Sequence, residues 1–165
     1  MPNYCSNRLM LNEDTNDSIL DVLKDYMDKK GNLSFQKIRP VPTAFKKMDK
    51  NDTELCKRII RKYGADSAWD WCVMNWGTKW GCDVYSAEPD GIGFVTAWSP
   101  PIGIVKQLSM LTGRDFRLTY IEEGEDYCGE YFSYPNWLHN HDHEFSPISS
   151  APKKLQKELV SEWTW

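Results

Sequence analysis

The chain has 165 residues, of which 41% are hydrophobic and 27% charged, and its formal net charge is −4. This length and composition are typical of one globular domain that buries a core without disulfides or a metal. The sequence contains neither an apolar run of membrane-spanning length nor the charged-then-apolar start of a signal peptide. We therefore expect a single domain over residues 1–165 that stays in the cytoplasm and has no membrane partner.

The cysteines are odd in number and never occur as Cys-x-x-Cys, which argues against a disulfide framework and a zinc ribbon. We expect reduced thiols that behave mostly as small buried hydrophobic side chains. They are Cys5, Cys56, Cys72, Cys82 and Cys128.

The first predicted element is a strand over residues 3–11, where apolar and polar side chains alternate. Asn7 shares the parity of the apolar face. Burying an amide is costly unless it is hydrogen-bonded. Asn7 therefore either tethers backbone in the core or lies beneath a pocket, and it is a candidate binding residue under the second interpretation.

Apolar residues at helical spacing predict a helix that begins at Asp14 or Thr15 and ends at Gly31. Residues 33–38 are predicted to form a second strand. It is expected to end at Pro40 and Pro42, because proline cannot donate a hydrogen bond to a sheet. The polar, lysine-rich residues 43–51 are predicted to be a loop.

A short helix is predicted from Asp52 or Thr53 to Gly64, with its apolar residues, Ile60 among them, facing inward. It belongs to a basic region, because positions 37 to 62 hold nine basic and three acidic residues. Such an asymmetry can mark a surface for an anionic partner, although charge clusters are more often solvated faces. The candidate residues on the outer face of this helix are Lys57, Arg58, Arg61 and Lys62.

The next predicted helix begins at Asp66 or Ser67 and ends at Gly77. It opens a segment, residues 69–99, that contains five of the eight tryptophans. Spacings of three, four and seven residues predict which side chains face the core. These are Trp69, Cys72, Val73 and Trp76.

A hairpin is predicted over residues 82–86 and 92–98, around the turn sequence Glu-Pro-Asp-Gly. Ser-Pro-Pro at 99–101 is a strong helix start, and the helix continues to Gly113.

Strands are predicted at residues 116–121 and 126–132. Residues 134–150 are expected to be irregular, and residues 152–163 to form a short basic helix. This order of elements predicts an α+β protein, with an antiparallel sheet and helices mainly on one face.

Four motifs carry a family resemblance: Met-Pro-Asn-Tyr-Cys-Ser-Asn at 1–7, Asn-Trp-Gly-Thr-Lys-Trp at 75–80, Thr-Ala-Trp-Ser-Pro-Pro at 96–101 and Tyr-Ile-Glu-Glu-Gly at 120–124. With them the chain resembles the YubB-like family, small phage and plasmid proteins with a ferredoxin-like domain. The resemblance covers about residues 1–133; it departs at Tyr4, where the family usually has Trp, and after position 133. It implies a ferredoxin-like core followed by a tail at 134–165, and a mobile-element setting, but no activity.

The turn at 75–80 is the first candidate site, because it displays an amide, an indole N–H and an ammonium group together. These groups could hold an anion stacked on an aromatic plane. Alternatively, the tryptophans join the helix to the sheet, and the lysine neutralises the helix C-terminus. The second candidate site is Trp98 together with the helix start that follows it. Two prolines at this start remove two of the backbone N–H donors that such a site would use. The candidates in this region are Asn75, Trp76, Lys79, Trp80 and Trp98.

Histidines at three alternate positions could suggest a metal site. In a polar segment near the end of the chain, they are more often solvated. The acidic turn at 122–126 could suggest metal-assisted hydrolysis, but an exposed turn explains it more simply. We predict no catalytic residue, metal ligand or cofactor here. The three histidines are His139, His141 and His143.

These observations favour a non-catalytic binding protein of a phage or plasmid that engages a host protein or a defence-system component. The first alternative is a protein that binds a nucleotide or a single-stranded nucleic acid through its tryptophans and basic segment. The second alternative is a metal-dependent enzyme acting on nucleic acid or nucleotides.

Overall fold

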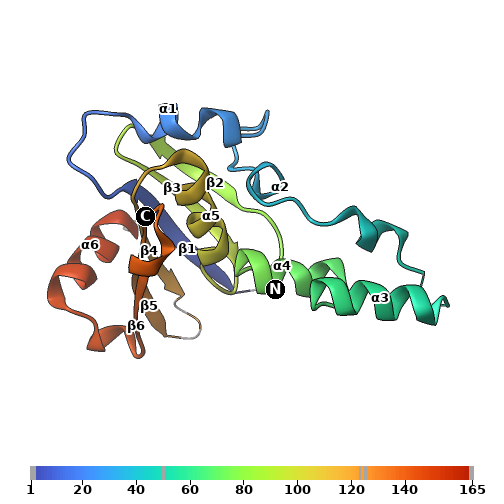
Figure 1. Cartoon of the computed structure of the whole chain (residues 1–165). Coiled ribbons are helices and arrows are strands. Elements are labelled where there is room, and N and C mark those ends of the chain that lie inside the picture. Colours follow the sequence, from blue (N-terminus) through green and yellow to red (C-terminus); the bar gives the residue numbers. More distant parts are fainter. Residues whose placement is uncertain (1–2, 50, 123, 125, 164–165) are drawn as a thin grey trace.

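The centre of the protein is a six-stranded antiparallel sheet with strand order β2-β3-β1-β4-β5-β6 (Figure 1). The structure is a computed structural model that describes residues 3–49, 51–122, 124 and 126–163. The strands are β1 (Tyr4–Leu11), β2 (Asp83–Glu88), β3 (Gly91–Ala97), β4 (Phe116–Glu122), β5 (Tyr127–Ser133) and β6 (His141–Phe145).

The connections between the strands define the fold. Helices link β1 to β2, and β3 lies between these two strands in the sheet. The helix α5 (Ile102–Thr112) links β3 to β4, and β1 lies between them. This repeated split β-α-β unit is the ferredoxin-like arrangement, so the predicted α+β fold is confirmed.

Strand β1 carries the centre of the hydrophobic core, because it lies between β3 and β4. Its alternate residues Cys5, Asn7 and Leu9 are fully buried. The helices α1 (Ile19–Leu23) and α5 pack their apolar residues into the same cluster. Other fully buried members of this cluster are Phe94, Ile104, Leu108, Phe116, Leu118 and Tyr120.

The first helix begins at Ile19, four or five residues later than predicted. The hydroxyl oxygen of Ser18 accepts a hydrogen bond from the backbone N–H of Leu20 and caps the helix there. The backbone N–H of Ile19 donates to the carbonyl oxygen of Pro89, so the hairpin turn also holds the helix start. A 3-10 turn, η1 (Lys24–Tyr26), follows the helix directly.

The prediction of a strand at residues 33–38 is wrong. Phe35–Ile38 form a short helix, α2, because the hydroxyl oxygen of Ser34 accepts a hydrogen bond from the backbone N–H of Lys37 at 3.3 Å. Leu33 takes part in an isolated β-bridge just before this helix. A short apolar run fits the periods of both helix and strand, and here the cap selects the helix.

The lysine-rich segment 43–51 contains a 3-10 helix, η2 (Thr43–Lys47), rather than a plain loop. Phe45 of this helix is buried, and its ring centroid lies 5.5 Å from that of Tyr63. This contact joins η2 to the helix that follows.

A helical arm extends from the sheet (Figure 1). It consists of α3 (Thr53–Tyr63), which points away from the sheet, and α4 (Ala68–Trp76), which leads back to it. Both helices end, as predicted, at a glycine in the left-handed conformation, Gly64 and Gly77.

The arm confirms only part of the inward face that the helical spacing predicted. The side chains buried as expected are Ile59, Cys72 and Trp76. Ile60, Trp69 and Val73, which were expected to face inward, are 41%, 50% and 43% exposed. Trp71 is buried instead. Since α4 carries apolar side chains nearly all round, its sequence does not define which side meets the core.

The C-terminal region completes the sheet and covers part of its second face. Residues 134–150, predicted to be irregular, contain β6, which pairs with β5. The predicted basic helix is present as α6 (Lys153–Trp163), whose Leu155 and Leu159 pack with Cys128 of β5. Within the described ranges, every helix is too short or too polar to cross a bilayer.

The helices α4 and α5 cross closely at Gly103. A Cβ atom added at Gly103 would overlap the backbone carbonyl oxygen of Asn75, near the end of α4. Since a backbone atom cannot move aside as a flexible side chain can, this crossing requires glycine.

The substitution Gly103→Ala is therefore expected to destabilise the protein by about 1–3 kcal/mol, although alanine is the better helix former. Urea unfolding followed by circular dichroism measures the effect. Gly81→Ala is the control, because nothing lies within 4 Å of a Cβ added there. It should change stability by less than about 0.5 kcal/mol, and equal losses in the two variants would contradict the prediction.

Candidate functional site

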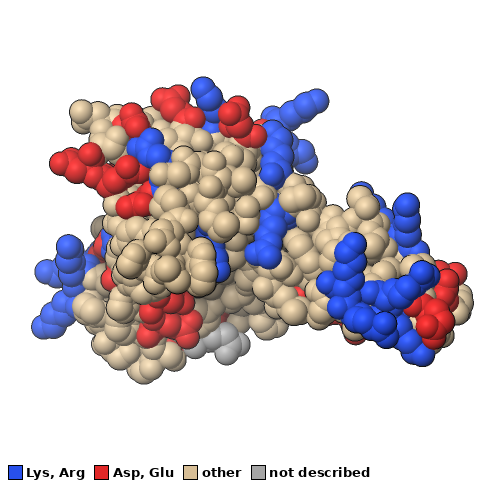
Figure 2. All heavy atoms as spheres, viewed as in Figure 1, with Lys and Arg blue, Asp and Glu red and all other residues tan. Residues whose placement is uncertain are grey.

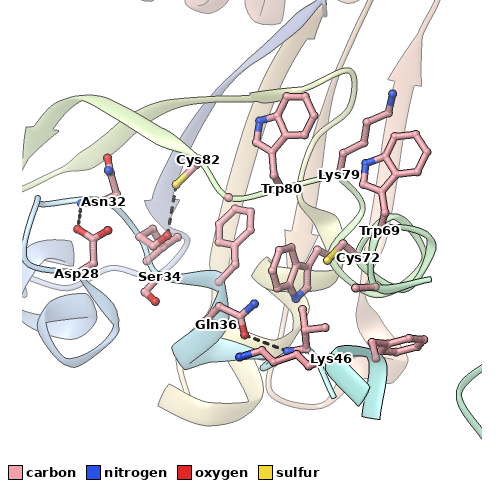
Figure 3. Close-up of a pocket in the computed structure, with 17 residues that line it drawn as sticks. Asp28, Asn32, Ser34, Gln36, Lys46, Trp69, Cys72, Lys79, Trp80 and Cys82 are labelled. Atoms are coloured by element: carbon pink, nitrogen blue, oxygen red, sulfur yellow. Dashed lines mark hydrogen bonds between the residues drawn. The ribbon is translucent and has the colours of Figure 1, made fainter. Parts of the chain in front are cut away.

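A surface groove of about 630 Å³ lies between α2, η2, α4 and the segment that leads into β2 (Figure 3). We name it the tryptophan groove, after Trp69, Trp76 and Trp80, which line it together with other largely apolar side chains. The remaining lining residues used below are Asp28, Asn32, Ser34, Phe35, Gln36, Phe45, Lys46, Cys72, Lys79 and Cys82.

Trp76 forms the inner wall of the groove. It is 4% exposed, and its indole N–H donates a hydrogen bond to the carbonyl oxygen of Arg39 at 2.8 Å. Its ring meets those of Phe35 and Trp71 edge to face, with centroids 5.5 and 6.2 Å away. Trp76 thus has the packing role that was one of the two interpretations of this turn.

The rim of the groove carries two exposed tryptophans and a lysine. Trp69 and Trp80 are 50% and 47% exposed, and Lys79 lies between them along one side of the groove (Figure 3). The Lys79 ammonium nitrogen is 4.8 Å from the centroid of Trp69 and 4.2 Å from that of Trp98. The cation is therefore held by two indole faces, at one end of the groove.

Trp98 supports Lys79 from outside the groove. Its backbone has a φ of 71°, and its carbonyl oxygen accepts a hydrogen bond from the hydroxyl of Tyr127 at 2.6 Å. The preceding strand therefore ends at Ala97, and the indole of Trp98, 42% exposed, turns toward the lysine.

Asn75 lies outside the groove and holds two elements together. Its side-chain oxygen accepts a hydrogen bond from Arg39 at 2.6 Å, and its backbone oxygen accepts a second one at 3.1 Å. Its amide nitrogen donates to the carbonyl oxygen of Trp71 at 2.9 Å. These bonds occupy the groups that a ligand would need.

Asn7 also lies outside the groove, in the core. Its amide nitrogen donates hydrogen bonds to the carbonyl oxygen of Cys5 at 2.8 Å and to the hydroxyl of Thr96 at 2.9 Å. That hydroxyl donates to the carbonyl oxygen of Ser99. This geometry matches the interpretation of Asn7 as a tether between β1 and β3 rather than as the floor of a pocket.

Sequence analysis missed the wall that faces Lys79. Phe35, Phe45 and Lys46 lie in segments that were predicted as a strand and a loop, so they were not grouped with the tryptophans. The one available signal was an aromatic residue, Phe45, within a polar, lysine-rich stretch.

Most polar side chains of the groove are already hydrogen-bonded within the protein. The side-chain oxygens of Asn32 and Gln36 accept from the backbone N–H groups of Val84 and Val41, at 2.9 and 3.0 Å. The carboxylate of Asp28 accepts from the backbone N–H of Asn32, which lowers the pKa of Asp28. Lys46 has no hydrogen bond or ion pair to any residue that the structure describes. The ammonium groups of Lys46 and Lys79 therefore remain for a bound molecule.

The thiols of two cysteines in the groove, Cys72 and Cys82, are expected to be unreactive. Burial raises the pKa of both thiols, and that of Cys82 reaches about 12. The Cys82 thiol donates to the carbonyl oxygen of Leu33 at 3.5 Å. Since the thiolate is the nucleophilic form, neither cysteine is activated for catalysis.

The predicted basic face of α3 is exposed and visible at the end of the arm (Figure 2). Lys57 pairs with Glu54 at 3.1 Å. The Lys62 ammonium lies 5.2 Å from the ring centroid of Tyr63, which in turn contacts Phe45 in the groove wall. The other two basic residues of this face, Arg58 and Arg61, are also exposed.

The histidines lie away from the groove. His141 and His143 are on β6, where His141 stacks on Phe132 with ring centroids 4.7 Å apart. His139 precedes them in a 3-10 turn. The described residues contain no group of three or more His, Cys, Asp or Glu placed to hold a metal ion. Of the acidic turn, positions 123 and 125 lie outside the described residues.

The comparison with family models indicates the domain type. The family model described as "Ferredoxin-like domain in Api92-like protein" matches residues 75–144. The crystal structure of a protein api92 from Yersinia pseudotuberculosis is similar to this chain with a TM-score of 0.46 and 10% identity; the match covers 92% of this chain and 100% of that one. No curated protein matches the chain. The family match supports a ferredoxin-like domain.

The two kinds of tryptophan in the groove should respond differently to truncation. We expect Trp76→Ala to destabilise the protein by about 3–5 kcal/mol, because it removes a buried ring. Trp80→Ala should cost less than about 1 kcal/mol, because nearly half of that side chain is exposed. Chemical unfolding of both variants measures the difference. Comparable losses would show that Trp80 is a core residue.

The thiols of the groove should be protected from alkylation. Iodoacetamide at pH 8 is expected to label Cys56, which is partly exposed, before Cys82, whose raised pKa leaves only about one thiolate in ten thousand at that pH. Peptide mass spectrometry of timed samples reads the order. In urea both cysteines should react at similar rates, and rapid native labelling of Cys82 would refute its assignment as an inert thiol.

Proposed function

We propose that this protein is a non-catalytic binding protein, and that the tryptophan groove captures a protein partner. The observation that carries the proposal is the open apolar groove rimmed by Trp69 and Trp80, both about half exposed. Exposed apolar patches of this kind mark interaction sites, and tryptophan is the residue type most enriched where binding energy concentrates.

The chemistry of the groove supports binding rather than a reaction. Its thiols are held in the protonated form, and Asn32 and Gln36 are hydrogen-bonded to backbone groups. What the groove offers is mainly apolar surface, two ammonium groups and, at one end, the carboxylate of Asp28. These features suit recognition of a partner.

The family resemblance supports a setting for this activity. Because the chain resembles the YubB-like proteins of phages and plasmids, we propose that it acts in the cytoplasm of a bacterial host. Many small genes of mobile elements serve host takeover and counter-defence. We therefore propose a host protein or a defence-system component as the partner, by analogy of setting.

A second candidate function is binding of a nucleotide or single-stranded nucleic acid. It is favoured by the position of Lys79 beside exposed indoles and by the basic face of α3 on the helical arm. Cations next to aromatic stacking surfaces are typical of single-strand binding.

Site-specific crosslinking tests the proposed function. A photoreactive phenylalanine analogue in place of Trp80 should crosslink to a discrete host protein in cell lysate. The same analogue in place of Val160, which is 62% exposed on α6, should not. Trp69→Ala should weaken the first crosslink, because it removes part of the groove wall.

Native mass spectrometry of the purified protein addresses the second candidate. A nucleotide that co-purifies with the wild type and is lost from Trp80→Ala would favour nucleotide binding. Equal crosslinking from positions 80 and 160, or none from position 80, would contradict capture of a partner in the groove.

A further inference from the structure

We infer that the occupant of the tryptophan groove is an acidic peptide segment of the partner that inserts one large apolar side chain. This inference rests on the proposed function and adds the chemistry of what is recognised. It follows from the volume of the groove, its largely apolar lining, and the distribution of charge around it.

The volume and lining of the groove suit an inserted side chain. Its volume of about 630 Å³ lies within the usual range of small-ligand sites, and its inner wall is the buried face of Trp76 with Phe35 and Phe45. An aromatic anchor would contact these rings and the exposed faces of the rim tryptophans. Large aromatic side chains dominate interface energetics when they fill such a pocket.

The groove offers little to read the edge of a nucleobase. A base carries donors and acceptors that need partners when they leave water. Most of the groove lining is apolar. The side-chain oxygens of Asn32 and Gln36 accept from backbone N–H groups, so the amide N–H groups of these two residues and the carboxylate of Asp28 are the main uncharged-donor and acceptor groups that a base would meet. An apolar side chain makes no such demand, so the groove suits a peptide anchor better than a base.

Positively and negatively charged side chains lie at different places around the groove. Lys79 and Lys46 come from opposite sides of the groove, and Asp28 lies at the end away from Lys79 (Figure 3). The lowered pKa of Asp28 keeps this carboxylate ionised. Acidic residues beside the anchor would therefore be attracted toward the two lysines and repelled from Asp28, which sets the direction of the bound segment.

An apolar surface continues beyond the groove along α4. Trp69 and Val73 are one helical turn apart and both exposed, and the neighbouring Met74 is 63% exposed. A phosphodiester backbone gains nothing from such a surface, whereas the side chains of a peptide would bury it. Together with Lys46 and Lys79 of the groove, the surface fits an acidic, amphipathic segment.

Fluorescence anisotropy with synthetic peptides tests the inference. The probe is a fluorescein-labelled peptide of nine residues with a central tryptophan flanked by aspartate and glutamate. A second peptide has the flanks changed to asparagine and glutamine, and a third has serine at the centre. We expect the first to bind at least about tenfold more tightly than the other two, and to weaken as salt rises.

Protein variants locate the binding. Trp80→Ala and Lys46→Glu should each weaken the acidic tryptophan peptide at least about tenfold. The matched charge control is Lys153→Glu on α6, which is exposed and remote from the groove, and it should bind like the wild type. Circular dichroism of each variant confirms that it is folded.

The outcomes separate the inference from the proposed function. If the neutral tryptophan peptide binds as tightly as the acidic one and depends on Trp80, the acidic preference is overturned, while the groove remains a protein-binding site. If an oligothymidylate of nine nucleotides binds through Trp80 and the acidic peptide does not, the occupant is a nucleic acid and the inference is overturned. If no peptide binds, the inference is overturned, and crosslinking from position 80 alone decides the proposed function.

Discussion

The groove depends on the hydrogen-bonded junction between Arg39 and the end of α4. The guanidinium group of Arg39 donates hydrogen bonds to the side-chain oxygen and the backbone oxygen of Asn75. The carbonyl oxygen of Arg39 accepts a hydrogen bond from the indole N–H of Trp76. The two walls of the groove come from segments far apart in sequence, and this junction sets their separation. At Gly103, α5 packs closely against the same end of α4, since only glycine permits this close approach of the two helices.

The tryptophans divide into two groups with opposite energetics. Trp71 and Trp76 are buried, so they contribute to the stability of the arm through apolar burial and ring contacts. Trp69 and Trp80 leave about half of their surface in water, although burial would be favourable. Because these side chains stay exposed around a concave surface, their burial does not stabilise the folded protein alone. A binding partner that covers them would gain that free energy. This contrast, rather than the number of tryptophans, supports the proposed binding role.

The candidate site was only partly predictable, because its two walls carry signals of different strength. The turn at 75–80 stood out by composition, and the structure brings three of its residues, Trp76, Lys79 and Trp80, to the groove. The opposite wall comes from segments whose apolar runs are too short for periodicity to separate helix from strand. A lysine such as Lys46 carries no signal of its own until its neighbours in space are known.

The sequence by itself determined the elements that strong local chemistry specifies. Caps and glycine stops set the limits of the arm helices, the proline-glycine turn set the hairpin, and alternation set β1 and β4. Tertiary structure alone decided which face of α4 is buried, that β6 joins the sheet, and that Asn7 and Asn75 bind protein groups. The physical reason is that helix and strand signals act over a few residues, whereas burial and hydrogen-bond partners are chosen by segments that meet only after folding.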